Sequence, residues 1–450
     1  MQNKSSTGYL QLLRQNKSFR NLWFGQVVSE LGDWLNSIAI YALILRLSDS
    51  GMAMAGAMMA KLLPIVLISP IAGVVVDRMS RKTVMIVSDL LRFLVVLGFL
   101  FVEDQSTLWF IYALVIIEIS LSGFFEPARS AIIPSLVPKE HVVTANALSG
   151  STWSVMLAFG AAIGGILVSL FGIRVAFIVD AFTFLISAWF ISKIHLETSP
   201  AKEQAKKNGF EEFMNSMRYL FKEPVVLVLS LLKPGLAVAG GIMTLIPLMA
   251  RQVISKPSML SFGIGVLYSA RGLGAALGPL LVKRFFGETA NVLRWSIATA
   301  FFLKSISYFF IANSENLWAL SFSVATATFF GSIIWVFSSS LIHLSTPDHY
   351  LGRVFSFELA LMTLVMGISN WGVGFGVDDL DLTSNEVAFW MAGLVALPGL
   401  LWTGFLTLYH KQLQQGECTA STFPIDPTGF NPRPMVREER IENKLQLGEK

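Results

Sequence analysis

The sequence has little charge and almost no cysteine. Only 14% of its 450 residues are charged, against roughly 25% in soluble globular proteins, while 54% are hydrophobic and the mean hydropathy is +0.61. The single cysteine, Cys418, excludes an intramolecular disulfide and a cysteine metal cluster. The polar segment 1–20 lacks the short apolar core of a cleavable signal peptide. Composition therefore predicts a membrane protein whose first membrane helix serves as the insertion signal.

Motifs for enzymes, metals and nucleotides are also missing. The five histidines are scattered, and no phosphate-binding loop is present. The run from Gly272 to Gly278 superficially resembles a dinucleotide fingerprint, but it lies inside an apolar segment rather than after a strand. Gly274 and Gly278, like Gly160 and Gly164, are spaced for close packing of membrane helices. We expect no enzymatic activity, no cofactor, no metal and no nucleic-acid partner.

Long apolar runs are what the sequence does contain. A bilayer-spanning helix needs about 20 mostly apolar residues. Twelve segments meet this length: 20–47, 53–76, 83–102, 107–128, 143–170, 173–193, 224–250, 259–282, 291–312, 317–343, 353–376 and 385–410. The sequence thus predicts an all-α membrane protein with twelve transmembrane helices in two six-helix lobes related by pseudo-symmetry.

A polar linker separates the two lobes. Segment 195–223 carries a short run of apolar residues at helical spacing, from Phe210 to Phe221, which predicts an amphipathic helix on the membrane surface. Related Pro-containing turns, at 138–141 and 347–349, precede the fifth and eleventh helices and support the repeat. The expected divisions are 1–19, a lobe at 20–194, the linker 195–223, a lobe at 224–413 and a disordered tail at 414–450.

The placement of charge predicts the orientation. Most of the 34 Lys and Arg residues fall in loops on the N-terminal side of the membrane, and cytoplasmic loops retain basic residues. The opposite loops are acidic, as at Glu103–Asp104 and Asp378–Asp381. We expect a multi-pass protein of a bacterial inner or plasma membrane with both termini in the cytoplasm.

Several ionisable residues fall inside the predicted membrane helices, where a charge costs at least a few kcal/mol. Asp33 lies about 20 Å along its helix, near the midplane, and Lys61 lies at a similar depth. Two interpretations are open: Asp33 and Lys61 form a structural pair, or Asp33 binds a proton or the substrate. Glu118 also falls near mid-depth in the fourth helix, and Asp180 lies about a third of the way in from the outer face of the sixth. Because burial lets a carboxylate exchange a proton near neutral pH, Asp33 and Glu118 are the preferred proton carriers.

The two halves differ in the sign of their buried charge. Asp89 and Arg92 lie three residues apart on one helix face, which predicts a structural pair. The second half is mainly basic: Lys233, Arg271 and Lys304, with Glu358 as the exception. An acidic lobe facing a basic lobe suits a zwitterionic or anionic amphipathic substrate better than a simple cation. Interior aromatic residues are candidates to line a greasy cavity: Trp153, Phe159, Trp335 and Phe355.

The charged turn between the second and third helices identifies a family. It contains Gly73, Asp77, Arg78, Arg81 and Lys82, and lipid cannot hydrate these charges, so it must lie at a water interface. The spacing resembles the signature loop of the major facilitator superfamily. That resemblance implies two lobes that rock about a central site, so that the substrate is exposed to each side in turn.

Three further stretches resemble the drug-efflux branch of the superfamily, which includes macrolide, tetracycline and enterobactin exporters. They are 22–33, 126–146 and 263–279. In the family, residues matching Asp77 and Arg78 lock the outward-facing state with an acid on the fourth helix, for which Glu126 is the candidate. Arg129 belongs to the same inner-face cluster. Breaking this cluster is the implied gating step.

Two departures from the family pattern are present. Antiporters of the superfamily commonly carry Gly-Pro-x-x-Gly-Gly in the fifth helix, whereas residues 160–165 have alanine in place of proline. The packing surface is kept, but the kink that proline provides is lost. The eighth-to-ninth loop keeps Lys283 and Arg284 but not the Asp-Arg pair.

The leading hypothesis is a proton-coupled exporter of an amphipathic organic compound, such as a drug or a siderophore. The proton gradient would be its energy source, the lipid bilayer its surroundings, and a monomer its expected state. A transporter of lipid or lysophospholipid remains an alternative, because it would also need a greasy cavity with a few fixed charges. A transport-inactive sensor or assembly partner is the alternative from another class.

Overall fold

The computed structural model describes residues 8–195, 220–287 and 289–421, and these ranges are helical with no strands. Within the described residues, one compact unit ends at Gly399 and a second begins at Leu400. Twelve helices in the described ranges are long and apolar enough to cross a membrane, as the sequence predicted. The predicted amphipathic helix of the linker and the tail from residue 422 lie outside the described residues.

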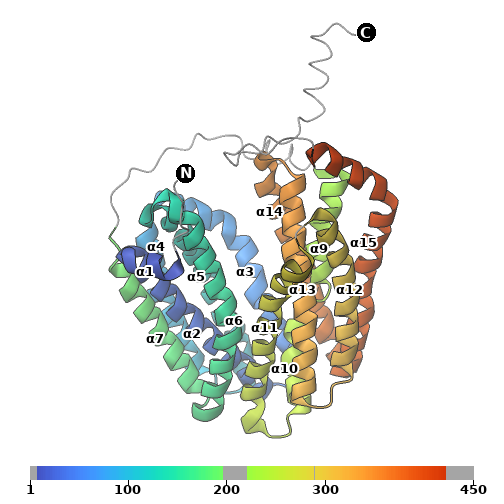
Figure 1. Ribbon diagram of the computed structural model, residues 1–450. Helices are drawn as coiled ribbons and strands as arrows, with labels where there is room; N and C mark the ends of the chain where they lie inside the picture. Colours follow the sequence, from blue (N-terminus) through green and yellow to red (C-terminus); the bar gives the residue numbers. More distant parts are fainter. Residues whose placement is uncertain (1–7, 196–219, 288, 422–450) are drawn as a thin grey trace, which may run out of the picture. The chain divides into compact units, whose positions relative to one another are not determined.

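The first lobe consists of the helices drawn from blue to green in Figure 1. They are α1 Tyr9–Gln15, α2 Lys17–Leu47, α3 Gly51–Arg78, α4 Arg81–Gly98, α5 Leu108–Leu136, α6 Val142–Phe171 and α7 Ile173–Ser192. Short 3-10 turns lie at Phe99–Phe101, Gln105–Thr107 and Lys139–His141. The helix α1, which precedes the first membrane helix, was not predicted.

The second lobe follows the linker and is drawn from light green to red. It contains α9 Pro224–Ala237, α10 Ile242–Val253, α11 Leu260–Phe286, α12 Ala290–Ala312, α13 Leu317–Ser345, α14 Asp348–Asp378 and α15 Ser384–Ser421, with a 3-10 turn at Pro257–Met259. The last helix continues beyond residue 413, so its final residues are helical where disorder was expected.

Capping side chains set several helix starts. Asn16 accepts a hydrogen bond from the Phe19 amide at 2.8 Å, so α2 begins three residues before the predicted boundary. The helix α3 runs through the signature sequence to Arg78, which leaves Met79 and Ser80 as the turn. Lys82 then donates to the carbonyl oxygens of Ser192 and Ile194, where a cation complements the end of α7.

The seventh membrane segment is broken between α9 and α10, which the hydropathy pattern did not predict. The break contains Gly240 and Gly241, which lie against α14 with no room for a side chain. Ser369 of α14 accepts from the Gly241 amide at 2.8 Å and donates to a carbonyl of the break, and the Tyr308 hydroxyl donates to the Ala239 carbonyl at 2.9 Å. Irregular backbone at membrane depth is stable here because neighbouring helices satisfy its polar groups.

Glycines allow close helix packing within each lobe. Gly160 and Gly164 of α6 lie against Trp34 and its neighbours on α2. Gly274 and Gly278 of α11 lie against the backbone of α13. A side chain at any of these four positions would force the paired helices apart.

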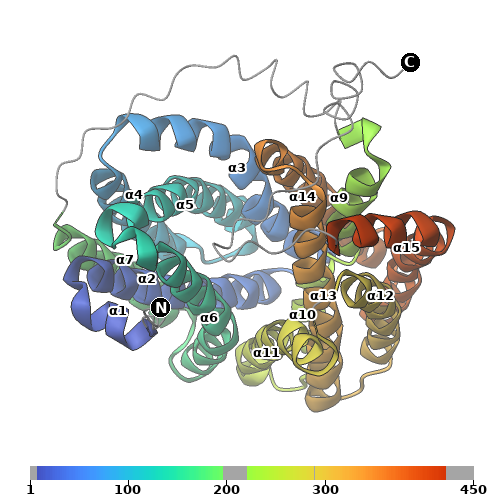
Figure 2. The same cartoon turned by 45° about the horizontal axis from the view of Figure 1, so that its top comes forward.

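Two helix pairs join the lobes, and both views show them side by side: α6 with α11, and α3 with α14 (Figures 1 and 2). At the first pair, Gly165 and Gly265 approach so closely that a Cβ on Gly165 would lie 2.9 Å from the Gly265 Cα. We call the bundle end with Arg78, Arg81 and Arg284 the basic end. The opposite end, with Asp49, Glu103 and Asp378, is the acidic end.

Candidate functional site

A group of four carboxylates surrounds one guanidinium in the first lobe, and we call it the acid cluster. Its members are Asp33, Asp89, Glu118 and Asp180, all of which act electrostatically on Arg92. Arg92 forms an ion pair with Asp33 and lies 3.8 Å from Glu118. The side chain of Asp33 is 36% exposed, whereas those of Arg92 and Glu118 are buried. Asp33 is therefore the accessible member of the cluster.

Neighbouring side chains fix the geometry of this cluster. Asn36, one turn along α2 from Asp33, donates from its side-chain amide to both Glu118 oxygens at 2.9 Å. The Arg92 guanidinium carbon lies 4.0 Å from the centre of the Phe184 ring, so an aromatic face covers the cation. The residues of the acid cluster and its neighbours thus come from four helices: α2, α4, α5 and α7.

The predicted Asp89–Arg92 pair is wrong. Arg92 points to Asp33 and Glu118 instead, and in the described part of the chain neither Asp89 oxygen has a hydrogen-bond partner. Spacing along α4 put the two residues on one face, but the acids of α2 and α5 compete for the guanidinium. Asp180 is also fully buried, with Thr183 as the hydrogen-bond partner of one oxygen at 3.3 Å.

Lys61 does not pair with Asp33. Its ammonium donates to the Ser37 hydroxyl at 2.7 Å and to the Tyr41 hydroxyl at 3.3 Å, and it lies 4.8 Å from the centre of the Tyr41 ring. The structural alternative for Asp33 therefore involves Arg92. Lys61 lies close enough to act electrostatically on Asp33 and Glu118.

A line of polar side chains leads from the basic end toward the acid cluster. Glu126 pairs with Arg129 at 2.6 Å, and Arg129 donates to the Gln26 oxygen at 3.0 Å. Gln26 in turn donates to Glu30 at 2.8 Å, one turn before Asp33. Gln26, Glu30 and Asn36 were not among the predicted site residues, although Gln26 and Glu30 lie in the stretch 22–33 that carries the family resemblance. Their spacing at 26, 30, 33 and 36 on one helix was the available signal.

The predicted gate residues at the basic end do not form the implied lock in this arrangement. Gly73, Asp77 and Arg78 are exposed, Arg81 is half-buried, and Glu126 contacts Arg129 rather than the signature turn. The lock belongs to the outward-facing state, so the role of these residues stays a prediction.

At the acidic end, side chains of the second lobe cap helices of the first. Asp378 of α14 accepts hydrogen bonds from the backbone amides of Gly51 at 2.7 Å and Met52 at 2.9 Å, and from the Ser50 hydroxyl. These donors form the start of α3, where a carboxylate complements the helix dipole. Arg251 of α10 donates to the Leu45 carbonyl at 2.8 Å, at the end of α2. Each cap thus matches the polarity of the helix end it contacts.

The second lobe buries its charges differently. Lys233 of α9 pairs with Glu358 of α14 at 2.8 Å. Lys304 is buried and donates to the Ala327 carbonyl at 3.0 Å, while Arg271 lies 5.9 Å from the centre of the Tyr268 ring. The structure therefore does not gather the predicted site residues of this lobe into one cluster.

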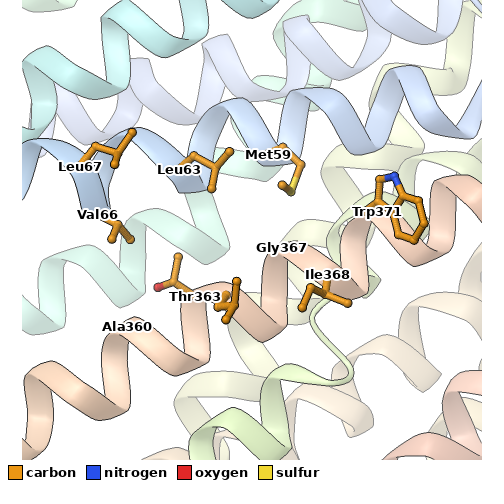
Figure 3. Close-up of a pocket in the computed structure, with 10 residues that line it drawn as sticks. Met59, Leu63, Val66, Leu67, Ala360, Thr363, Gly367, Ile368 and Trp371 are labelled. Atoms are coloured by element: carbon orange, nitrogen blue, oxygen red, sulfur yellow. The ribbon is translucent and has the colours of Figure 1, made fainter.

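An apolar slot of about 320 Å³ lies between the lobes, where α3 and α14 separate (Figure 3). Its walls carry Met59, Leu63, Val66 and Leu67 of α3, facing Ala360, Thr363, Leu364, Gly367, Ile368 and Trp371 of α14. The Thr363 hydroxyl already bonds to the Leu359 carbonyl at 2.8 Å, so the slot has no free polar group there. It suits a hydrocarbon rather than a polar molecule.

The chemistry open to the acid cluster is proton exchange. Arg92, even with Lys61 nearby, cannot balance four carboxylates, so full ionisation would leave uncompensated negative charge in a buried site. Protons relieve that charge, and the partly exposed Asp33 gives them access. In the described residues no group of acids, histidines or cysteines is arranged to hold a metal ion.

Known proteins resemble this chain over nearly its full length. The family model described as transmembrane secretion effector matches residues 8–423. The MFS-type transporter YfiS of Bacillus subtilis is 26% identical, with 90% of this chain and 95% of YfiS covered. BacE of Bacillus subtilis, named as a bacilysin exporter, is 24% identical over 90% of this chain and 99% of its own. Macrolide efflux protein A of Streptococcus pyogenes is 24% identical, covering 78% and 87%.

Solved structures share the fold at low identity. The POT family transporter PepTSo has a TM-score of 0.68 at 11% identity and covers 88% of this chain and 99% of its own. The nucleoside transporter NupG gives 0.67 at 12%, covering 85% and 99%. Together with the twelve helices and the signature turn, these matches show that the chain belongs to the major facilitator superfamily, in its transmembrane secretion effector family.

Proposed function

We propose that the protein exports an amphipathic organic compound in exchange for protons. The observation that carries the proposal is the acid cluster, in which Asp33 is both paired with Arg92 and partly exposed. A substrate or a proton that reaches Asp33 changes the charge balance of the whole cluster. The relatives named as exporters and efflux proteins support outward transport.

The polar line of the first lobe supplies a proton acceptor, Glu30, next to the acid cluster. Glu30 lies between Gln26 and the acid cluster, and one of its oxygens is buried without a hydrogen-bond partner among the described residues. Such an oxygen can accept a proton from Asp33. Gln26 and Arg129 only hold the carboxylates of the line in place, because neither side chain gives up a proton near neutral pH, so water would carry the proton on to Glu126. In the proposed orientation the basic end is cytoplasmic, so protons leave there.

The contacts between the lobes support alternating access. Asp378 and Arg251 hold the lobes together at the acidic end, whereas Asp77 and Arg78 are exposed at the basic end. We interpret this arrangement as open to the cytoplasm and ready to load substrate. Rocking of the lobes would break the acidic-end contacts and form the lock that the signature turn predicts.

Efflux in cells tests the proposal. Cells that express Asp33→Asn or Glu118→Gln should retain a panel of toxic compounds that wild-type cells expel, because each variant removes a titratable member of the cluster. Glu103→Gln is the matched control, since Glu103 pairs with Arg174 on the exposed surface. Unchanged efflux in both cluster variants would remove these residues from the mechanism.

Transport of a lipid or lysophospholipid is a second candidate. The apolar slot between α3 and α14 favours it, because the lining is mostly apolar and the Thr363 hydroxyl is already bonded to a carbonyl. Labelled lysophospholipid offered to vesicles separates the two functions. Its movement across the bilayer without competition from the toxic compounds would favour the lipid transporter.

A further inference from the structure

Two aromatic rings, those of Trp335 and Phe355, face the Lys233–Glu358 pair, and we call this group the aromatic frame. The Lys233 ammonium lies 4.9 Å from the centre of the Trp335 ring and 5.3 Å from that of Phe355. Lys233 and Glu358 are 6% and 2% exposed, whereas Trp335 is 43% exposed. α9, α13 and α14 each supply part of this frame. Proteins bind organic cations in the same way that the Lys233 ammonium is held here, with a carboxylate as partner and aromatic rings facing the cation.

The position of the frame suits a substrate site. Lys233 and Glu358 each lie about ten residues, or roughly 15 Å, from the start of their helix at the basic end. Trp335 lies ten residues before the end of α13. The three groups are therefore at one depth within the membrane, between the basic end and the midplane.

The pairing of Glu358 is incomplete. Lys233 binds one oxygen of this carboxylate, while the second oxygen is buried and has no hydrogen-bond partner in the described part of the chain. A pair kept only for structure is stable when all its lone pairs are satisfied. The second oxygen of Glu358 can instead accept a donor that arrives with a ligand.

We propose that this frame is a binding site for the cationic nitrogen of an amphipathic substrate, and that Lys233 occupies it as an internal competitor. An arriving ammonium or amidinium group takes the place of the Lys233 ammonium on Glu358 and between the aromatic rings. Lys233 returns when the substrate leaves. The buried carboxylate stays paired at each stage, which avoids the cost of an isolated buried charge. The proposal rests on the proposed export function and names a cationic substrate class. This class differs from the zwitterionic or anionic one that the signs of the buried charges predicted, because Glu358 gives the mainly basic lobe a carboxylate whose second oxygen has no partner among the described residues.

The test is equilibrium binding of rhodamine 6G, a fluorescent cationic amphiphile with N–H donors, to the purified full-length protein. Lys233→Met removes the competitor and should tighten binding about tenfold. Glu358→Gln removes the carboxylate and should weaken binding by about tenfold or more. Lys304→Met is the matched control, because it removes a buried lysine of the same lobe that has no acidic partner in the described residues. Its affinity for the probe should equal that of the wild type.

Opposite signs for the two variants distinguish a binding site from a structural pair. Weaker binding in both Lys233→Met and Glu358→Gln, or no change in either, would overturn the proposal. So would a wild-type protein that does not bind the probe. If Lys233→Met fails to fold, Trp335→Leu decides, since Trp335 is largely exposed. Binding that weakens several-fold supports the frame, and unchanged binding overturns it.

Transport of the same probe separates this proposal from the export function. One outcome is that everted vesicles take up rhodamine 6G when a proton gradient is applied, while Lys233→Met and Glu358→Gln do not change its binding. This outcome would support the export function and contradict the proposed binding site. The other outcome is that Lys233→Met tightens and Glu358→Gln weakens binding, but a proton gradient does not drive transport of the probe. This outcome would support the binding site and contradict proton-coupled export of the probe.

Discussion

The two lobes bury charge in opposite ways. The first lobe places four carboxylates around Arg92, whereas the second pairs Lys233 with Glu358 and leaves Lys304 bound to a backbone carbonyl. The excess acid of the first lobe can be relieved by protons. The second lobe has no comparable excess among its described residues. The difference teaches that two lobes of one fold can bury charge in different ways, and our proposals assign proton exchange to the first lobe and substrate recognition to the second.

Removal of Arg92 should break this comparison most severely. In Arg92→Met, Asp33 and Glu118 lose their counter-ion in a buried site, which costs about 3–5 kcal/mol in the free energy of unfolding. Unfolding in detergent measures the loss. Arg174→Met is the control, since its exposed pair with Glu103 contributes about 0–1 kcal/mol. Equal losses in the two variants would show that Arg92 does not balance the acid cluster.

Loss of Asn36 should have a moderate effect. Asn36→Leu keeps the approximate volume but removes both hydrogen bonds to Glu118, at a cost of about 1–3 kcal/mol. Unfolding of the purified variant measures this cost. In Asn36→Leu/Glu118→Leu the acceptor is also removed, and most of the lost stability should return. No recovery in the double variant would contradict the assigned contact.

The contact between the lobes should be weaker than the contacts within the acid cluster. Asp378→Asn removes the negative charge at the start of α3 and should cost about 0.5–2 kcal/mol in lobe closure. The measurement is alkylation of a cysteine at position 52, in a Cys418→Ser background, by a reagent on the acidic side. Alkylation should become faster by a factor of about 2 to 30. An unchanged rate would show that Asp378 does not hold this end closed.

The smallest effect is expected at Lys304. Lys304→Met removes one hydrogen bond to the Ala327 carbonyl and no ion pair among the described residues, so the free energy of unfolding should change by only about 1 kcal/mol. Proton coupling should persist, because this lysine is in the other lobe. Loss of coupling in this variant would place proton exchange in the second lobe and reverse the comparison.

The sequence predicted the spans and the depth of the buried charges, because hydropathy and rise per residue determine both. It could not predict which way each helix faces. Asp89 and Arg92 share one face of α4, yet Arg92 reaches Asp33 and Glu118 on neighbouring helices. Lys61 has the right depth to meet Asp33 but points to Ser37. Partners across helices depend on rotation about each helix axis, which hydropathy does not record.

The break at Gly240 and Gly241 shows that the sequence also could not predict this feature of the backbone. Two adjacent glycines weaken a helix, but a membrane normally forces the backbone to satisfy itself. The break is stable because Ser369 and Tyr308 supply the missing hydrogen bonds from α14 and α12. Those partners lie far away in sequence, so no local pattern indicates them.

The central claim is that the acid cluster exchanges protons when substrate binds. The most direct test adds an exported compound to the purified protein in weakly buffered detergent solution and measures the number of protons that the protein releases. The account predicts proton release by the wild type and by Lys304→Met, and none by Asp33→Asn/Glu118→Gln at saturating substrate. Equal release by the wild type and the double variant would contradict it.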